Sequence, residues 1–360
     1  MADVEKETLI DKLSEYGVFT YTFIPMYEMP HLYTPFEKIT NCSTEESVRK
    51  AVERRELISL KGISGSGKTC VVQHVFLTPR VDCFPVVLSP IKEDIVTVCS
   101  SQEEFIRFML SQMLEAVRQF TSVEKEIKEL AKDALAQKIS YVEGKNRKLS
   151  FRLGGLFSIL PFLSSVQPEL ALDLGSFLQK SLEGKIYNTQ RVQCIQRLSE
   201  TIEEYGIMPV FFLDDTDKFL KHPEIDLSSV VPKFFGLIVP ILSKLECPCI
   251  IATHPYYQQF EIYKQTEKNY FDCLVDIPEI EYEGLTRIVQ KRIESVEEAP
   301  WTDVFSEGTM KLIYQRYKKN RRMRDPMSLC KACVDWASQN HVEKISELVL
   351  ASVLVDDHQT

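Results

Sequence analysis

The chain has 360 residues, and its 43 basic and 52 acidic side chains give a formal net charge of −9. At about 150 residues per domain, this length corresponds to roughly two domains. Hydrophobic residues make up 44% of the chain, enough for a packed core, and this excludes a mainly disordered protein. The net acidity argues against a dedicated nucleic-acid coat protein, which needs a basic face, but it leaves room for a local basic patch.

The N-terminus and the apolar segments predict a cytoplasmic chain. Residues 1–6 lack the basic and apolar regions of a secretion signal. The longest uncharged run, residues 153–168, is shorter than the ~20 apolar residues that span a bilayer, so we expect no transmembrane segment. Without a secretion signal, the ten cysteines are expected to be reduced thiols.

A strand-like run at residues 57–61 leads directly into residues 62–69, which satisfy the pattern G-x-x-x-x-G-K-[ST]. Residues 70–76 can continue as a helix, and this strand, loop and helix context indicates a phosphate-binding loop. Backbone N–H groups of such a loop surround phosphates, and the positive end of the helix dipole adds to the attraction. The alternative is a glycine turn without a ligand.

The phosphate-binding loop predicts individual roles for its residues. The residues expected to bind the nucleotide are Gly62, Ile63, Ser64, Gly65, Ser66, Gly67, Lys68, Thr69 and Cys70. Lys68 is expected at the β- and γ-phosphates, and the Thr69 hydroxyl is expected to ligate Mg²⁺, which prefers oxygen ligands. The sequence contains no Asn-Lys-x-Asp guanine signature, so we expect ATP.

An apolar strand at residues 208–213 ends in two aspartates, Asp214 and Asp215. Its nearly continuous apolar character is typical of a central parallel strand that is covered on both faces. We expect Asp214 to hold Mg²⁺ and Asp215 to act as the base that orients the attacking water. Alternatively, Asp215 only caps the following turn. Because aspartate is shorter than glutamate, hydrolysis is expected to be slow.

A third strand, residues 249–252, ends in Thr253 and His254. Polar side chains at this end of a parallel strand lie at the edge where open α/β sheets bind ligands, so either residue is a candidate sensor of the γ-phosphate. Alternatively, both only cap the turn before Pro255. Apolar segments at 84–88 and 271–277 complete a set of five strands.

This order of motifs resembles the AAA+ ATPases over about residues 34–352, within the branch that includes origin-recognition initiators, STAND switches and related standalone prokaryotic ATPases. Residues 213–218 resemble the Walker B motif of KAP-type and STAND-type NTPases, and residues 250–255 resemble their sensor 1 strand. The resemblance implies a three-layer α/β/α P-loop NTPase core with a parallel sheet, followed by a C-terminal helical lid. Residues 282–293 resemble the first helix of that lid.

The same resemblance extends to the end of the lid. Residues 322–330 resemble the sensor 2 helix, and Arg324 best fits the arginine that approaches the γ-phosphate. Residues 344–347 and Ala351 resemble the closing helix. The implied organisation is an N-terminal extension (1–33), an ATPase core (34–278), a lid (279–352) and a tail (353–360), with ATP between core and lid.

Two features depart from the family pattern. No arginine occurs between Leu198 and Thr286, where the family's trans-acting arginine finger would lie. Lys264 or Lys268 would be a weaker substitute, because lysine lacks the planar fork of arginine. The sequence also ends at Thr360, so the winged-helix DNA-binding domain of the initiators is not expected.

A third departure is an insertion at about residues 100–190. A long helix is predicted from residue 103 to about 140. Two runs with strand periodicity then predict a hairpin within residues 149–174, with an apolar tip at 156–163. An exposed tip would bind a second copy, a partner effector protein or a membrane face, whereas a buried tip would be core.

A basic cluster near the end of the chain contains no acidic residue. Its members are Lys311, Arg316, Lys318, Lys319, Arg321, Arg322 and Arg324. Such a cluster suits nucleic-acid phosphates. The favoured interpretation is one solvated helix face with a single functional arginine.

The sequence therefore predicts an ATP-binding and slowly hydrolysing switch that couples its nucleotide state to lid closure and to partner or self-assembly. The resemblance suggests a role in prokaryotic antiphage defence with a separate effector. The first alternative is an ATP-dependent DNA loader or regulator similar to replication initiators or transposition ATPases. The second alternative is a non-catalytic scaffold with bound ATP.

Overall fold

The computed structural model describes residues 8–19, 30–78, 83–89, 95–120, 188–204, 206–221 and 225–356. The chain forms two compact units. The first comprises the described residues of Met1–Glu46, Ile63–His74 and Ile277–Thr360, and the second comprises those of Ser47–Gly62 and Val75–Asp276.

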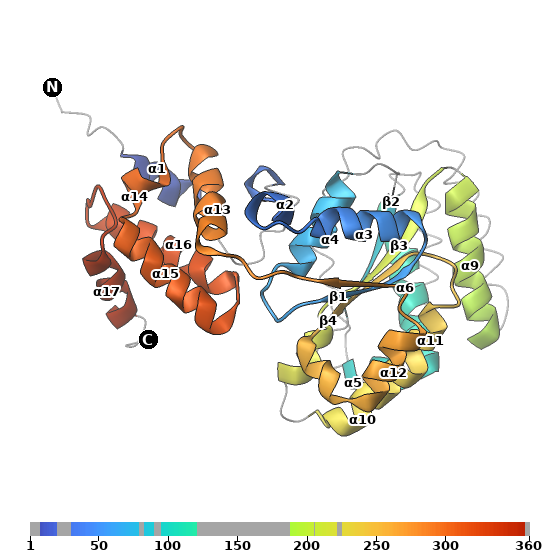
Figure 1. The fold of residues 1–360 in the computed structure, drawn as a ribbon. Coiled ribbons are helices and arrows are strands. Elements are labelled where there is room, and N and C mark those ends of the chain that lie inside the picture. The colour runs from blue at the N-terminus through green and yellow to red at the C-terminus, as the bar shows by residue number, and fades with distance from the viewer. Residues whose placement is uncertain are drawn as a thin grey trace, which may run out of the picture. The chain divides into compact units, whose positions relative to one another are not determined.

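A parallel sheet of five strands forms the centre of the second unit (Figure 1). The strands are β1 (Leu57–Lys61), β2 (Cys83–Leu88), β3 (Met208–Leu213), β4 (Cys249–Thr253) and β5 (Cys273–Asp276). Their order in the sheet is β2-β3-β4-β1-β5, and every neighbouring pair is parallel. The predicted fold class is confirmed, because the chain combines a parallel α/β core that carries a P-loop motif with a helical C-terminal part.

Both faces of the sheet are covered. In β1, Leu57 and Ser59 point to one face and Ile58 to the other, yet none is more than 3% exposed. Burial on both faces explains why the strands are nearly continuous apolar runs. The helical elements between the strands are α5 (Ile95–Ser100), α6 (Gln102–Phe120), α9 (Asn188–Glu204), η5 (Thr216–Lys221), α10 (Leu227–Lys233), η6 (Phe234–Ile238), α11 (Val239–Leu242), η7 (Pro255–Gln259) and α12 (Glu261–Asn269). Two further helices, α3 (Thr44–Glu53) and α4 (Lys68–Leu77), run from one unit into the other along the chain.

The core of the second unit combines aliphatic side chains with aromatic and sulfur-containing ones. Phe105, Met109 and Met113 repeat at helical spacing along α6, and each is fully buried. Rings of Phe234 and Phe235 meet edge to face at 4.9 Å. The long helix predicted from residue 103 is described as α6 up to Phe120, and its predicted continuation lies outside the described residues, as does the predicted hairpin at 149–174.

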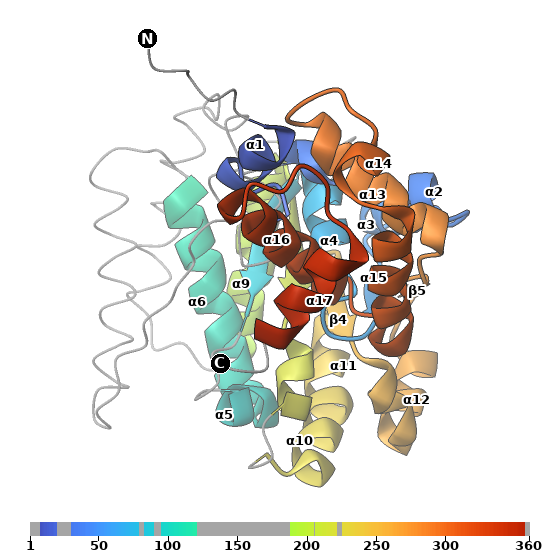
Figure 2. The ribbon, with the colours of Figure 1, turned by 90° about the vertical axis from the view of Figure 1, so that its left-hand side faces the viewer.

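The first unit is helical (Figure 2). Its C-terminal helices are α13 (Tyr282–Glu294), α14 (Trp301–Val304), α15 (Glu307–Asn320), α16 (Arg324–Gln339) and α17 (Glu347–Asp356), and its N-terminal elements are α1 (Leu9–Glu15), η1 (Pro30–Leu32) and α2 (Phe36–Ile39). Helix α1 lies against α16. Ser14 donates a hydrogen bond to Asp335 at 2.8 Å, and Ser338 donates one to Asp11 at 2.7 Å. The N-terminal segment is therefore part of the C-terminal helical unit, which the sequence did not predict.

The end of the first unit differs from the prediction in one detail. The closing helix begins at Glu347 and not at residue 344, so that part of the prediction was wrong. Ile345 instead forms a short parallel bridge with Phe305: its amide donates to Val304 at 2.8 Å and its carbonyl accepts from Ser306 at 2.8 Å. The bridge uses the Ile345 carbonyl, which would otherwise accept a hydrogen bond within the first turn of a helix. No helix of the described part of the chain is long and apolar enough to cross a membrane.

Candidate nucleotide-binding site

The predicted phosphate-binding loop follows directly from β1. Lys61, the last residue of β1, pairs with Thr253 of β4 on one side and with Asp276 of β5 on the other. The Gly62 amide then donates to the Thr253 carbonyl at 3.1 Å. The loop therefore begins at the C-terminal edge of the sheet, which is the edge where parallel α/β sheets bind ligands.

Two glycines give the loop its shape. Gly65 has a φ of 80° and Gly67 a φ of 108°, and both values lie in the left-handed region that other residues rarely adopt. The Lys68 ammonium donates to the Ile63 carbonyl at 3.0 Å, and Lys68 is 7% exposed. The Ser66 hydroxyl is buried and has no hydrogen-bond partner among the described residues. A buried hydroxyl of this kind suits an anionic ligand in the loop.

The N-terminus of α16 contacts the same loop within the first unit. The Met323 amide donates to the Gly65 carbonyl at 2.9 Å. A Cβ atom on Gly65 would lie 3.5 Å from the Arg324 Cβ and 3.8 Å from the Arg322 Cβ. The structure therefore brings the predicted sensor 2 residue and the loop together, and it places Arg322 almost as close.

Residues before α3 contact the loop and the helix that follows it. A ring carbon of Phe36 would lie 3.9 Å from a Cβ atom on Gly67, and the Tyr33 ring lies 4.6 Å from the ring of His74. Glu45 accepts hydrogen bonds from the Tyr33 hydroxyl at 2.5 Å and from the Phe36 amide at 2.8 Å. Burial, together with the Glu45 carboxylate, raises the pKa of Tyr33, so this hydroxyl remains a donor. Sequence reasoning missed these residues, because only their aromatic character marked them.

The two aspartates lie at the same edge of the sheet as the loop start. The Asp214 amide donates to the Leu88 carbonyl at 3.0 Å and extends the pairing of β3 with β2. Asp215 has a φ of 62°, and its amide donates to the Asp214 carboxylate at 2.8 Å. Its own Oδ2 accepts from Ser89 Oγ at 2.8 Å and pairs with Lys218 Nζ at 2.7 Å. No sequence pattern predicted the contacts of Ser89 and Lys218 with Asp215.

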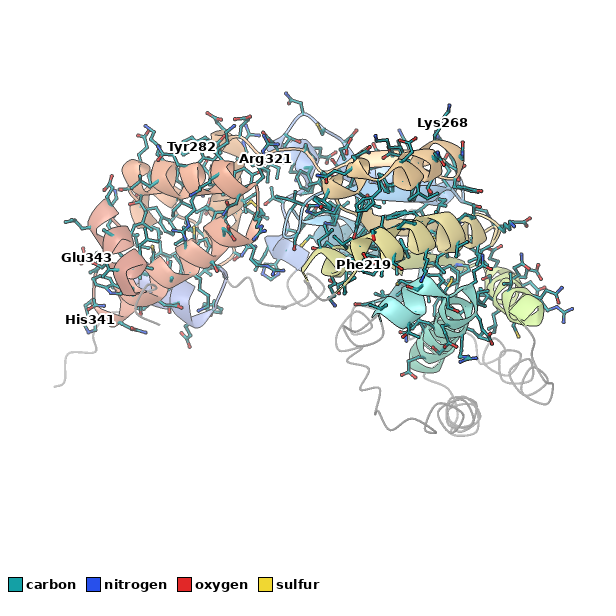
Figure 3. All side chains as sticks on the ribbon, turned by 90° about the horizontal axis from the view of Figure 1, so that it is seen from below. Phe219, Lys268, Tyr282, Arg321, His341 and Glu343 are labelled. Atoms are coloured by element: carbon teal, nitrogen blue, oxygen red, sulfur yellow. The ribbon has the colours of Figure 1, made fainter. Side chains whose placement is uncertain are left out.

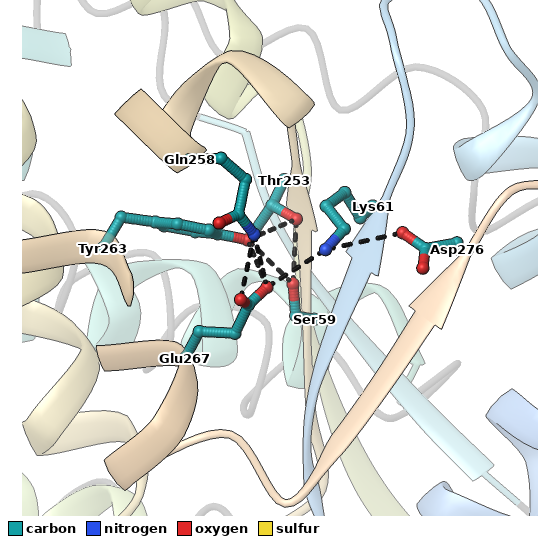
Figure 4. A network of polar contacts seen from close by, with 7 residues as sticks. All are labelled: Ser59, Lys61, Thr253, Gln258, Tyr263, Glu267 and Asp276. Carbon is teal, nitrogen blue, oxygen red and sulfur yellow. Dashed lines mark hydrogen bonds and ion pairs between the residues drawn. The ribbon is translucent and has the colours of Figure 1, made fainter. Parts of the chain in front are cut away.

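Thr253 belongs to a buried polar network (Figure 4). Its hydroxyl lies 2.8 Å from Ser59 Oγ of β1 and 3.4 Å from the Tyr263 hydroxyl of α12. Tyr263 also donates to Glu267 at 3.3 Å, and Glu267 pairs with Lys61 at 3.1 Å. Burial raises the pKa of Tyr263 and keeps this hydroxyl protonated. Thr253 thus links β1, β4 and α12.

His254 has a different position from Thr253. Its Nδ1 accepts a hydrogen bond from the Tyr256 amide at 3.1 Å, so it caps the first turn of η7. This is the geometry of the capping alternative. A γ-phosphate sensor role for Thr253 or His254 stays a prediction.

The basic cluster lies on α15 and on the turn into α16. Lys311 pairs with Glu307, Arg321 (labelled in Figure 3) pairs with Glu279, and Lys318 lies over the Tyr314 ring. The members without an acidic partner among the described residues are Arg316, Lys318, Lys319, Arg322 and Arg324, and all five are exposed. The surface therefore offers five cations whose charge is not neutralised by a described carboxylate.

No protein-family model matches the sequence, and no curated protein matches it. Among solved structures, the chain is similar to the Orc1 protein of Aeropyrum pernix, whose structure was solved in complex with DNA. The two chains are 13% identical, the TM-score is 0.46, and the match covers 91% of this chain and 68% of the Orc1 chain. A similarity this distant carries no argument about function. The candidate nucleotide site is therefore identified from its own residues alone.

The Thr253 network leads to a test of its structural role. Thr253→Val should lower the free energy of unfolding by roughly 1–3 kcal/mol, because Ser59 Oγ loses its closest partner in a buried site. In a Ser59→Ala background, the same change should cost clearly less. Urea denaturation of the two single variants and the double variant measures this coupling. The exposed Thr302→Val is the matched control, and additive effects would contradict the network.

Proposed function

We propose that this protein is an ATPase of the AAA+ type that binds ATP tightly, hydrolyses it slowly and acts as a switch. The observation that supports this most directly is the loop at residues 62–69, which directly follows β1 and contains two left-handed glycines, Gly65 and Gly67. Open parallel sheets bind phosphates at such a loop, because its N–H groups converge at the start of a helix. The buried Ser66 hydroxyl provides a further donor for a phosphate oxygen.

The residues of the loop and of β3 fit a nucleotide with Mg²⁺. Glycines at 65 and 67 leave the backbone free of side chains, and Lys68 carries the charge for the β- and γ-phosphates. Thr69 and Asp214 would hold Mg²⁺ through oxygen atoms, the ligands that it prefers. When bound, Mg²⁺ neutralises the charge that develops on the phosphates. Asp215 would orient the attacking water as the general base.

The switch would work through the N-terminus of α16. The Met323 amide donates a hydrogen bond to the Gly65 carbonyl, so a movement of the loop would also move the N-terminus of α16. Arg324, the first residue of that helix, would bind the γ-phosphate and thereby set the position of the C-terminal helices. Thr253 or His254 would report the same phosphate from β4. Partners would bind through residues 149–174.

The biological context is a proposal that rests on the family resemblance alone. We place the protein in the STAND-like group of standalone prokaryotic ATPases. Such a protein would work in the cytoplasm with a separate effector in antiphage defence.

Replacing Asp215 tests the proposed hydrolysis. Asp215→Asn should lower steady-state phosphate release at least tenfold, because a general base typically contributes a factor of about 100 or more. The Kd for ATP should change less than about threefold, whereas Lys68→Ala should abolish binding. The exposed Asp303→Asn is the control. Equal rates at background for wild type and Asp215→Asn would favour the non-catalytic scaffold.

The two arginines beside Gly65 can be separated by substitution. Arg324→Ala should weaken ATP binding about tenfold relative to ADP, because a charge-assisted hydrogen bond to the γ-phosphate is lost. Arg322→Ala and the exposed control Arg316→Ala should change this ratio by less than about twofold. Isothermal titration with both nucleotides measures the ratio. The opposite ranking of Arg322 and Arg324 would move the sensor role to Arg322.

A second candidate function is ATP-dependent DNA binding. The five exposed cations without an acidic partner among the described residues favour it. If they bind phosphates, the logarithm of the association constant should fall linearly with the logarithm of the salt concentration, and charge removal at Lys319 should flatten the slope by about one. Duplex titrations with and without ATP measure this. Lack of ATP-dependent binding at low salt would reject this candidate.

A further inference from the structure

The carboxylate proposed as the general base is already held by two donors. Asp215 Oδ2 accepts from Ser89 Oγ at 2.8 Å and from Lys218 Nζ at 2.7 Å. Ser89 follows β2 directly, and Lys218 lies in η5, three residues after the aspartate. Both bonds end on Oδ2, so an ammonium and a hydroxyl occupy one of the two carboxylate oxygens and fix the orientation of the group.

The backbone that carries Lys218 is firmly anchored. The Thr216 hydroxyl donates to the Ala252 carbonyl of β4, and the Thr216 carbonyl accepts from the Tyr257 hydroxyl at 2.5 Å. Phe219, labelled in Figure 3, is 2% exposed, and its ring lies 5.6 Å from that of Phe234. Because Thr216 and Phe219 hold η5 in place on either side of it, Lys218 would leave Asp215 by a change of side-chain rotamer and not by a movement of η5.

The aspartate itself is held in an unfavourable backbone conformation. Its φ of 62° lies in the left-handed region, which is strained for a residue with a Cβ atom. The bond from the Asp215 amide to Asp214 and the bond from the Lys218 amide to the Asp215 carbonyl, at 2.9 Å, maintain this turn. The turn and the ion pair therefore aim the carboxylate at Lys218.

We propose that Lys218 is a positioning residue that restrains hydrolysis by pairing with Asp215, and that it must release the carboxylate before water can be oriented. This inference rests on the proposed role of Asp215. The side chains of Lys218 and Asp215 are 31% and 35% exposed, and ion pairs with this exposure are weak. A nearby anion, such as a γ-phosphate or a partner's carboxylate, would compete with Asp215 for the lysine.

Phosphate release with MgATP tests the restraint. Lys218→Met should raise kcat about three- to tenfold with little change in KM, while Lys218→Arg should keep the wild-type rate, because it preserves the pair. Adding Asp215→Asn to Lys218→Met should return the rate to background. Lys233→Met, which removes an exposed lysine of α10, is the matched control.

Ionic strength supplies a readout that a purely structural role would not change. Salt screens the pair, so turnover of the wild type should approach that of Lys218→Met as salt rises, while the variant should respond less. Circular dichroism of each variant verifies folding.

Three outcomes would overturn the inference. A rate for Lys218→Met equal to or below that of the wild type, with Asp215→Asn inactive, refutes the restraint and leaves the proposed base intact. Wild-type turnover by Asp215→Asn refutes the proposed base together with the restraint. Background rates for all variants refute both the hydrolysis and the restraint, and ATP binding measured by titration then decides whether the proposed nucleotide site survives.

Discussion

The hydrogen bond from the Gly62 amide to the Thr253 carbonyl continues the parallel pairing of β1 with β4, and the candidate site depends on this register. Parallel strands end at a common edge, so the pairing sets Gly62, the first residue of the candidate loop, beside the end of β4, and β3, which the two aspartates follow, is the next strand. A slip of one residue would turn Ser59 and Lys61 to the opposite face of the sheet. It would break the polar network and separate the loop start from β4.

The same pairing explains why polar side chains are buried on an otherwise apolar sheet. Buried polar groups are costly unless they are hydrogen-bonded, and Ser59, Thr253 and Tyr263 satisfy one another at the end of the sheet. Through Glu267, the network reaches Lys61, the residue before the loop. A continuous series of hydrogen bonds and ion pairs therefore connects α12 with the start of the loop. Thr253 belongs to this series, so it has a structural role besides its predicted sensor role.

Charge is unevenly distributed around the candidate nucleotide residues. The chain carries a net −9, yet the turn into α16 presents Arg322 and Arg324 close to Gly65. In the second unit, the acidic pair after β3 is partly neutralised, since Asp215 pairs with Lys218. The two exposed arginines are available for an anionic ligand, whereas the ion pair with Lys218 occupies the Asp215 carboxylate.

Local sequence patterns determined the strands, the phosphate-binding loop and the position of the two aspartates, because each of these depends on consecutive residues and on the period of the apolar positions. Only the tertiary structure decided which distant residues meet: Ser14 bonds to Asp335 over 321 positions, and Ser89 reaches Asp215 over 126. It also placed Arg322 almost as near to Gly65 as Arg324, a comparison that a motif cannot make. Such contacts depend on how elements pack, and packing between distant segments leaves no periodic signal in the sequence.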